Sequence, residues 1–173
     1  MTAFSLRPSK PEDLARLRDI EADAATLFPP DVLRGRAART LPPRVLLAAH
    51  QAGLLWVAEW ERAGVVGFLA AAQPGDCLHI IEMDVRRGHG RKGIGAVLLR
   101  HACSAAQSRG LAWVTLTTFE HLPWNAPFYA RHGFGPPDTL GPFPHLTEAL
   151  RQEQAEGLDR RVALVKRTAG PLA

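Results

Sequence analysis

A short segment near the middle of the chain, residues 86–95, combines four glycines with four side chains that carry positive charge. These residues are Gly88, Gly90, Gly93 and Gly95 together with Arg86, Arg87, Arg91 and Lys92. The segment follows an apolar, strand-like run (78–85) and precedes a run with helical spacing (96–109). Glycines leave backbone N–H groups accessible, and the positive end of the helix dipole adds to the charge of the basic side chains. A strand, a basic glycine-rich turn and a helix in this order predict a binding site for a pyrophosphate.

Two common nucleotide-binding patterns fit this segment poorly. A Walker A loop needs Lys and then Ser or Thr after its last glycine, but apolar residues follow Gly93 and Gly95. The dinucleotide pattern G-x-G-x-x-G is matched literally by Gly88, Gly90 and Gly93. Its context differs, because no repeated βαβ unit surrounds it and the nearest acid after the next strand, Glu120, comes later than the ~20 residues that the pattern expects. A dinucleotide-binding oxidoreductase is therefore the weaker alternative.

Residues 90–95, with the sequence GRKGIG, resemble the phosphate loop R/Q-x-x-G-x-G/A of the GNAT (GCN5-related N-acetyltransferase) family. Gly93 and Gly95 take the places of the two glycines of that loop. The first position, which is Gln or Arg in the family, is Gly90 in this chain. We expect Arg91 and Lys92 to replace the contact that is lost there.

A second motif, residues 124–134 with the sequence WNAPFYARHGF, resembles the last signature of the same family. It contains Tyr129, the only tyrosine of the chain. The resemblance implies that Tyr129 lies beside the coenzyme sulfur and serves as general acid for the departing thiolate. The alternative for Tyr129 is a core aromatic ring with a hydrated hydroxyl. The chain departs from the family at Leu122, where Asn is usual, and we interpret Asn125 as a helix N-cap.

Composition limits the class of protein. A length of 173 residues with 46% hydrophobic residues suits one domain, and the resemblance covers residues 4–166. We expect a single N-acetyltransferase domain over residues 4–167 and a short C-terminal tail over 168–173. The longest apolar run, 65–72, is shorter than the ~20 residues of a membrane helix, and the N-terminus has no signal-peptide pattern.

Cysteine content and charge narrow the class further. Cys77 and Cys103 have no metal-ligand spacing and are typical of small buried side chains in a cytoplasmic protein. The net charge of +4 is concentrated at the glycine-rich turn and around residues 34–44. A nucleic-acid-binding face needs a longer basic surface with interleaved aromatic side chains. We therefore expect neither a nucleic-acid nor a membrane partner.

The remaining patterns predict an α/β fold in which helices flank a single mixed, mostly antiparallel central sheet. Strands are expected at residues 4–7, 54–60, 65–72, 78–85, 112–118 and 161–166. Helices are expected after a capping box that begins at Ser9, from Asp31 to about Thr40, and over residues 96–109, 127–132 and 147–155. The resemblance implies the acyl-CoA N-acyltransferase fold. In this fold the sheet splays at the strand before the phosphate loop, and the cofactor enters between this strand and the next.

The strand over residues 78–85 carries the candidate bases. An amine must lose a proton before it attacks a thioester, and Glu82 is the first candidate to remove it, with Asp84 as the second. Glu82 as a solvated or salt-bridged acid near Arg86 is the alternative. His79 lies on the opposite face of the strand by alternation, so His79 and Glu82 cannot share one ion, and no metal site is expected.

The resemblance also implies where the cofactor binds. Backbone groups near the end of this strand pair with the amides of the pantetheine arm, and the phosphate loop holds the pyrophosphate. These positions are Met83, Val85, Arg91, Lys92, Gly93, Ile94, Gly95 and Ala96. Acetyl-CoA is the expected co-substrate.

Together these features predict an acyl-CoA-dependent N-acyltransferase that moves acetyl from acetyl-CoA to a primary amine by direct attack. The acceptor is a small-molecule amine or an amine of a peptide or protein, and no pattern in the sequence names it. Glu21, Asp23 and Asp31 can attract a cationic amine, but we interpret them as a solvated helix face. A non-catalytic acyl-CoA-binding module is the other alternative. A homodimer is compatible with the family.

Overall fold

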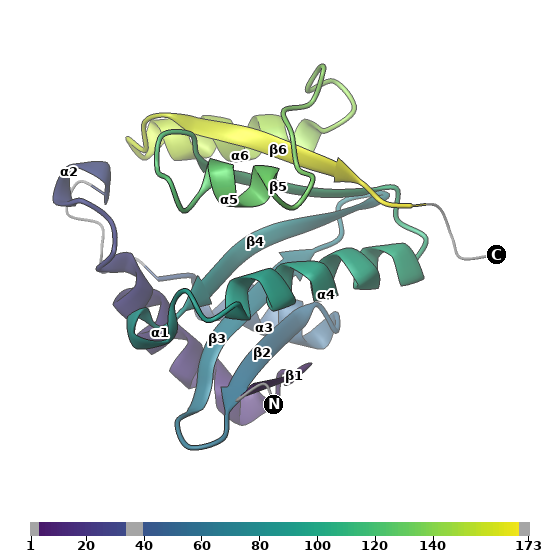
Figure 1. The fold of residues 1–173 in the computed structure, drawn as a ribbon. Helices are drawn as coiled ribbons and strands as arrows, with labels where there is room; N and C mark the ends of the chain where they lie inside the picture. Colours follow the sequence, from purple (N-terminus) through teal and green to yellow (C-terminus); the bar gives the residue numbers. More distant parts are fainter. Residues whose placement is uncertain (1–3, 34–39, 170–173) are drawn as a thin grey trace. The chain divides into compact units, whose positions relative to one another are not determined.

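The structure is a computed structural model that describes residues 4–33 and 40–169. Within this part of the chain, six strands form one mixed sheet in the order β1-β2-β3-β4-β5-β6 (Figure 1). They are β1 (Phe4–Pro8), β2 (Leu55–Trp60), β3 (Gly64–Ala72), β4 (Cys77–Val85), β5 (Trp113–Phe119) and β6 (Arg161–Arg167). The pairs β1–β2, β2–β3 and β5–β6 are antiparallel, and β4–β5 is parallel. The single mixed sheet confirms the expected fold class.

Helices connect these strands. They are the 3-10 turn η1 (Pro11–Asp13), α1 (Leu14–Ala25), α2 (Pro30–Leu33), α3 (Pro43–Gln51), the 3-10 turn η2 (Arg87–His89), α4 (Ile94–Ser108), α5 (Ala126–Ala130) and α6 (Pro144–Ala155). The contacts divide the chain into two compact units. The first contains residues 4–33, 40–72 and 81–102, and the second contains residues 73–80 and 103–169. The strand β4 contributes to both.

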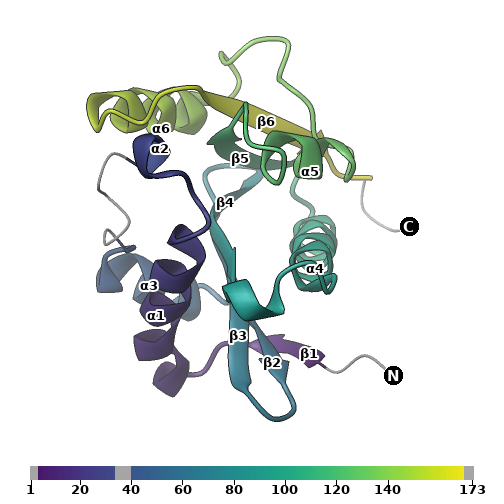
Figure 2. The ribbon, with the colours of Figure 1, turned by 60° about the vertical axis from the view of Figure 1, so that its left-hand side comes forward.

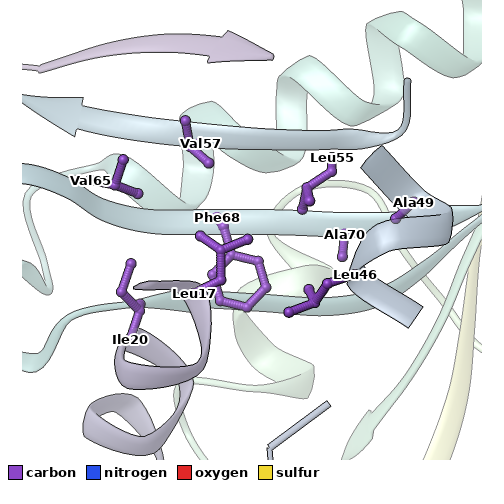
Figure 3. Close-up of a cluster of buried hydrophobic side chains, with 9 residues drawn as sticks. All are labelled: Leu17, Ile20, Leu46, Ala49, Leu55, Val57, Val65, Phe68 and Ala70. Carbon is purple, nitrogen blue, oxygen red and sulfur yellow. The ribbon is translucent and has the colours of Figure 1, made fainter. Parts of the chain in front are cut away.

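In the first unit, α1 and α3 cover one face of β2 and β3, and α4 lies on the other face (Figure 2). A cluster of buried apolar side chains joins α1 and α3 to the sheet (Figure 3). Its members are Leu17, Ile20, Leu46, Ala49, Leu55, Val57, Val65, Phe68 and Ala70. The register of β2 and β3 shifts between Ala58 and Glu59, so Val65 and Phe68 both reach this core although they are three residues apart. Each large apolar side chain buried in this way stabilises the fold by about 1.5–3 kcal/mol.

In the second unit, α6 packs on β5 and β6. The buried side chains there are Cys77, Phe143, Leu146, Ala163 and Val165. Trp113 joins them with its ring edge-on to Phe143 at 5.3 Å between centroids. The parallel pairing of β4 with β5 covers only residues 77–79 and 113–115, whereas β5 continues along β6 to Phe119. The parallel ladder is therefore short.

One local expectation was wrong, one lies partly outside the described residues, and one helix was not expected. The cap of the first helix is formed by Lys10 and Asp13, whose Oδ2 accepts the Lys10 N–H at 2.7 Å, while Ser9 Oγ hydrogen-bonds His50 Nδ1 at 2.8 Å. The helix α3 was not expected; it begins at Pro43 after the N-cap Pro42, and no side chain caps it. The helix expected from Asp31 to Thr40 is described only as α2, since residues 34–39 lie outside the described part.

Candidate active site

The glycine-rich turn leads directly into α4. Gly93 has a φ of 83°, a backbone conformation that favours glycine, and a Cβ added there would meet nothing within 4 Å. Its carbonyl accepts the N–H of Val97 at 3.0 Å, so Gly93 precedes the first turn of the helix. The first N–H groups of a helix have no acceptor within the helix. The turn therefore leaves open space beside backbone donors at the positive end of the α4 dipole.

Contacts from other elements hold this turn in place. Arg91 also has a positive φ, 58°, which costs a residue with a side chain about 1 kcal/mol. The backbone N–H of Arg87 donates to Asp23 Oδ2 of α1 at 2.7 Å, and Lys92 Nζ donates to the carbonyl of Gly88 at 3.1 Å. Since the turn is tied at both ends, the left-handed residue between them is maintained without a ligand.

Gly67 of β3 sets the distance between β3, the end of β4 and the start of α4. A Cβ at Gly67 would lie 2.9 Å from the Asp84 carbonyl, 3.2 Å from Val85 Cγ2 and 3.3 Å from Ile94 Cγ2. The N–H of Arg86 also donates to the Val66 carbonyl at 2.7 Å. Only glycine at position 67 permits this approach, which fixes where the strand ends and the turn begins.

We expect Gly93→Asp to weaken acetyl-CoA binding at least tenfold, about 1.4 kcal/mol, measured by calorimetry. The carboxylate would enter the open space in which we place the pyrophosphate, and the two anions repel. Gly110→Asp is the matched control, because Gly110 follows the other end of α4 with a φ of 69° and open space around its Cα. Both variants strain the backbone alike, so equal dissociation constants in the two folded variants would contradict the assignment of the turn.

Three carboxyl groups interact in the first unit. Glu82 and Asp84 lie two residues apart on β4, and Glu21 comes from α1. Glu21 is only 8% exposed, and both of its carboxyl oxygens lie 2.8 Å from the N–H of Leu41. Burial, followed by the charge of Glu82, raises the pKa of Glu21 to about 7. Burial, followed by the charges of Glu82 and Glu21, raises the pKa of Asp84 well above its ordinary value.

The cluster corrects the interpretation of Glu21 and adds a contact to that of Glu82. Glu21 does not belong to a solvated helix face, since it is buried and hydrogen-bonded. Asp31 is exposed, and Asp23 holds the glycine-rich turn. Glu82 is half-buried, and its Oε1 accepts the N–H of Met83 at 3.2 Å. The backbone donor expected to meet the pantetheine arm is thus engaged by the candidate base.

Tyr129 belongs to the second unit and lies on α5. Its ring is half-buried and contacts Phe128 and Phe134, with centroids at 5.2 Å and 5.8 Å. The Asn125 carbonyl accepts the N–H groups of Phe128 and Tyr129, and the Asn125 side chain makes no cap hydrogen bond. The tyrosine is therefore fixed by its ring and its backbone.

His79, which sequence alternation excluded from a metal site, takes part in a polar network of the second unit. Its Nδ1 lies 3.1 Å from Thr115 Oγ1, which lies 2.9 Å from His145 Nε2. Thr115 is fully buried. Burial, followed by the positive charge of His145, lowers the pKa of His79 to about 4. The folded protein therefore stabilises the neutral form of His79.

We expect acid to destabilise the protein through His79. Between its ordinary pKa of 6.5 and its folded-state pKa of about 4, the unfolded chain binds more protons, so stability is present above pH 6.5 and is lost as the pH falls towards 4. The loss amounts to about 3 kcal/mol. Denaturant unfolding at pH 7 and pH 4.5 should show a smaller loss for His79→Asn than for the wild type. His101→Asn, at an exposed position, is the control. Equal losses in the wild type and His79→Asn would contradict this role.

Two properties of the described residues concern membrane-spanning helices and metal sites. Across residues 4–33 and 40–169, no helix combines the length and the apolar character that spanning a membrane requires. Among the same residues, no group of three or more His, Cys, Asp or Glu side chains has a geometry suited to a metal ion.

Comparison with known proteins identifies the family. The model of the acetyltransferase (GNAT) family matches residues 15–134, and the chain belongs to this family. This confirms the resemblance inferred from the two sequence motifs.

Three solved structures with the same fold illustrate the relationship. The PaiA N-acetyltransferase of Thermoplasma acidophilum, in complex with coenzyme A, is 17% identical, with 95% of this chain and 98% of that chain covered at a TM-score of 0.69. The ribosomal-protein-S18-alanine N-acetyltransferase of Escherichia coli is 16% identical, with 98% and 96% covered at a TM-score of 0.66. A GNAT family acetyltransferase of Brucella melitensis, in complex with acetyl-CoA, is 21% identical, with 78% and 84% covered at a TM-score of 0.57. At these identities the likeness concerns the fold.

Sequence reasoning missed two residues of this region. The prediction that Glu21 lies on a solvated helix face was wrong, because a single acid in an amphipathic helix carries no sign of its burial. Gly67 was not singled out, although a glycine inside an apolar strand is a recognised sign of close backbone approach.

Proposed function

We propose that this chain is an acyl-CoA-dependent N-acetyltransferase that transfers acetyl from acetyl-CoA to a primary amine by direct attack. The observation that carries the proposal is the position of the carboxyl cluster. Two of its three members, Glu82 and Asp84, lie on the strand whose end leads into the glycine-rich turn and α4. The candidate base for the amine and the candidate binding site for the pyrophosphate thus lie on consecutive segments of the chain.

The turn supplies the cofactor-binding part of this proposal. The N–H groups after Gly93 and the positive end of α4 bind the pyrophosphate, and Arg91 adds charge from an exposed position. Met83 and Val85 offer backbone groups to the pantetheine amides. When the arm engages the Met83 N–H, the Glu82 carboxylate that now accepts it is released to act on the amine.

Glu82 is the proposed base because it lies half-buried on β4, next to two carboxyl groups whose pKa values are raised. Its negative charge raises the pKa of both Glu21 and Asp84, which therefore hold their protons more readily. A base must be unprotonated before it can act, and their raised pKa values make Glu21 and Asp84 less suited to that role at neutral pH. The same negative charge attracts a cationic amine.

Tyr129 is proposed as the general acid that protonates the leaving thiolate. A thiol with a pKa of ~8.5 is a moderate leaving group, so a single hydroxyl donor assists it without being indispensable. We propose residues 4–167 as one N-acetyltransferase domain. The proposed location is the cytoplasm, and a homodimer is compatible with the proposal.

The acceptor is proposed as a small-molecule amine or an amine of a peptide or protein. The names of the structural relatives include an enzyme that acts on an alanine of ribosomal protein S18, so amines of proteins belong to the range of acceptors to be tested.

Calorimetric titration of the purified protein with acetyl-CoA, and then with NADH, tests the cofactor. We expect saturable binding of acetyl-CoA and no heat from NADH, because the context of the glycine-rich turn excludes a dinucleotide fold. Binding of NADH without binding of acetyl-CoA would support an oxidoreductase instead. Binding of acetyl-CoA without turnover on any amine would support a non-catalytic acyl-CoA-binding module.

A further inference from the structure

The aromatic ring of Trp60 contacts two residues of the glycine-rich turn. Trp60 is the last residue of β2 and is distant from the turn in sequence. The ring of His89 meets it edge-on, with centroids 5.1 Å apart at an interplanar angle of 65°. Lys92 Nζ lies over the Trp60 ring, 4.8 Å from its centroid. One side chain of the sheet thus touches both halves of the turn.

The Lys92 side chain hydrogen-bonds within the turn itself. Its ammonium donates to the Gly88 carbonyl at 3.1 Å, so it spans from one side of the turn to the other while it rests on the indole. Trp is the strongest aromatic partner for a cation, and at an exposed residue such as Lys92 the contact contributes about 0.5–1 kcal/mol. The contact with Trp60 therefore selects the Lys92 conformation that closes the turn.

His89 supports the same arrangement. Its backbone N–H donates to the Arg86 carbonyl at 2.8 Å, and its Nδ1 is shielded from solvent without a hydrogen-bond partner. Burial, followed by the charges of Lys92 and Arg86, lowers the pKa of His89. A neutral His89 ring is consistent with this environment. Its contact with Trp60 is then a van der Waals contact between two rings and not a cation–π contact.

We infer that Trp60 is a positioning residue for the phosphate-binding turn and acts through Lys92 and His89. This inference rests on the proposed function. By fixing the turn before the cofactor arrives, Trp60 removes part of the ordering cost of binding. Lys92 then contributes to affinity by closing the turn, not by an independent contact with phosphate. Loss of the indole should affect acetyl-CoA binding and leave the chemical step unchanged.

A double-mutant cycle tests this coupling. The acetyl-CoA dissociation constant is measured for the wild type, Trp60→Leu, Lys92→Met and the double variant. We expect each single change to weaken binding about tenfold, about 1.4 kcal/mol, and the double change to weaken it no further. In turnover, KM for acetyl-CoA should rise in the same proportion, while kcat and KM for the amine stay at the wild-type values. Trp60→Phe, which keeps a ring for the cation, should recover most of the affinity.

The matched control is Trp113→Leu. Trp113 is also a strand tryptophan with a cation over its ring, Arg167 at 5.7 Å, but it packs against Phe143 and not against the turn. Its acetyl-CoA affinity should equal that of the wild type. If Trp60→Leu does not fold, the cycle is repeated with Trp60→Met, which also removes the ring, and Lys92→Met.

The outcomes distinguish a failure of the positioning role of Trp60 from a failure of the proposed function. Wild-type affinity in Trp60→Leu, or losses that multiply in the double variant, would overturn the positioning role and assign Lys92 an independent phosphate contact. Failure of the wild-type protein to bind acetyl-CoA would overturn the proposed function, and the positioning role with it.

Discussion

Replacing Glu82 by Gln is expected to lower kcat/KM for the amine about 100-fold at neutral pH, the effect of losing a general base. Gln keeps the size of the side chain and can still accept the Met83 N–H, so the fold and the cofactor affinity should persist. The loss should shrink as the pH rises, because a growing share of the amine is already deprotonated. Steady-state kinetics across pH measure both effects.

The neighbours of Glu82 sharpen this test. The charge of Glu82 raises the pKa of Glu21 and Asp84, so Glu82→Gln lets both ionise at lower pH. If Asp84 or Glu21 were the base, Glu82→Gln would keep its activity and extend it towards acid. Asp84→Asn identifies that case directly, and Glu61→Gln, at an exposed position of the β2–β3 turn, is the control. A wild-type pH profile in Glu82→Gln would contradict its role as base.

Tyr129→Phe is expected to lower kcat about 10- to 100-fold, a loss of about 1.4–2.7 kcal/mol in transition-state stabilisation. The affinity for acetyl-CoA should not change, because a phenylalanine ring keeps the contacts with Phe128 and Phe134. The chain has no other tyrosine that could replace the donor. Pre-steady-state release of CoA and calorimetric binding of acetyl-CoA measure the two quantities separately.

The competing interpretation of Tyr129 is a packing role, and it predicts the reverse. A missing hydroxyl would then leave kcat intact and lower the melting temperature slightly. Phe128→Leu serves as the control for packing, since Phe128 contacts Tyr129 but offers no proton donor. A kcat within twofold of the wild type in Tyr129→Phe would exclude the acid role and leave Tyr129 a packing residue.

Much of the fold was predictable because its strands and helices are marked by local signals. Alternating or continuous apolar runs bounded by Gly, Pro and Asp identified β2, β3 and β4 within a residue of their observed limits. The stripe of apolar side chains in α4, which includes Leu98, Leu99, Ala102 and Ala106, is buried as its spacing predicts.

What the sequence could not predict depends on contacts between distant segments. Glu21 is buried because the chain returns from α1 to place the Leu41 N–H against its carboxyl group, and no local pattern encodes that return. Trp60 reaches the turn only because the end of β2 lies beside Lys92 and His89 in the fold. The β-bulge near Ala58 likewise shifts Val65 and Phe68 onto one face against strict alternation.

The most direct measurement is the release of free thiol from acetyl-CoA by the purified protein in the presence of a panel of primary amines. The panel includes small mono- and diamines, amino acids, and peptides with a free N-terminus or lysine. We expect at least one amine to give release that depends on both acetyl-CoA and protein, saturates with amine, and falls about 100-fold in Glu82→Gln. Acetyl-CoA binding with no amine-dependent thiol release across the panel, or release that is equal in the wild type and Glu82→Gln, would contradict an N-acetyltransferase built on this carboxylate.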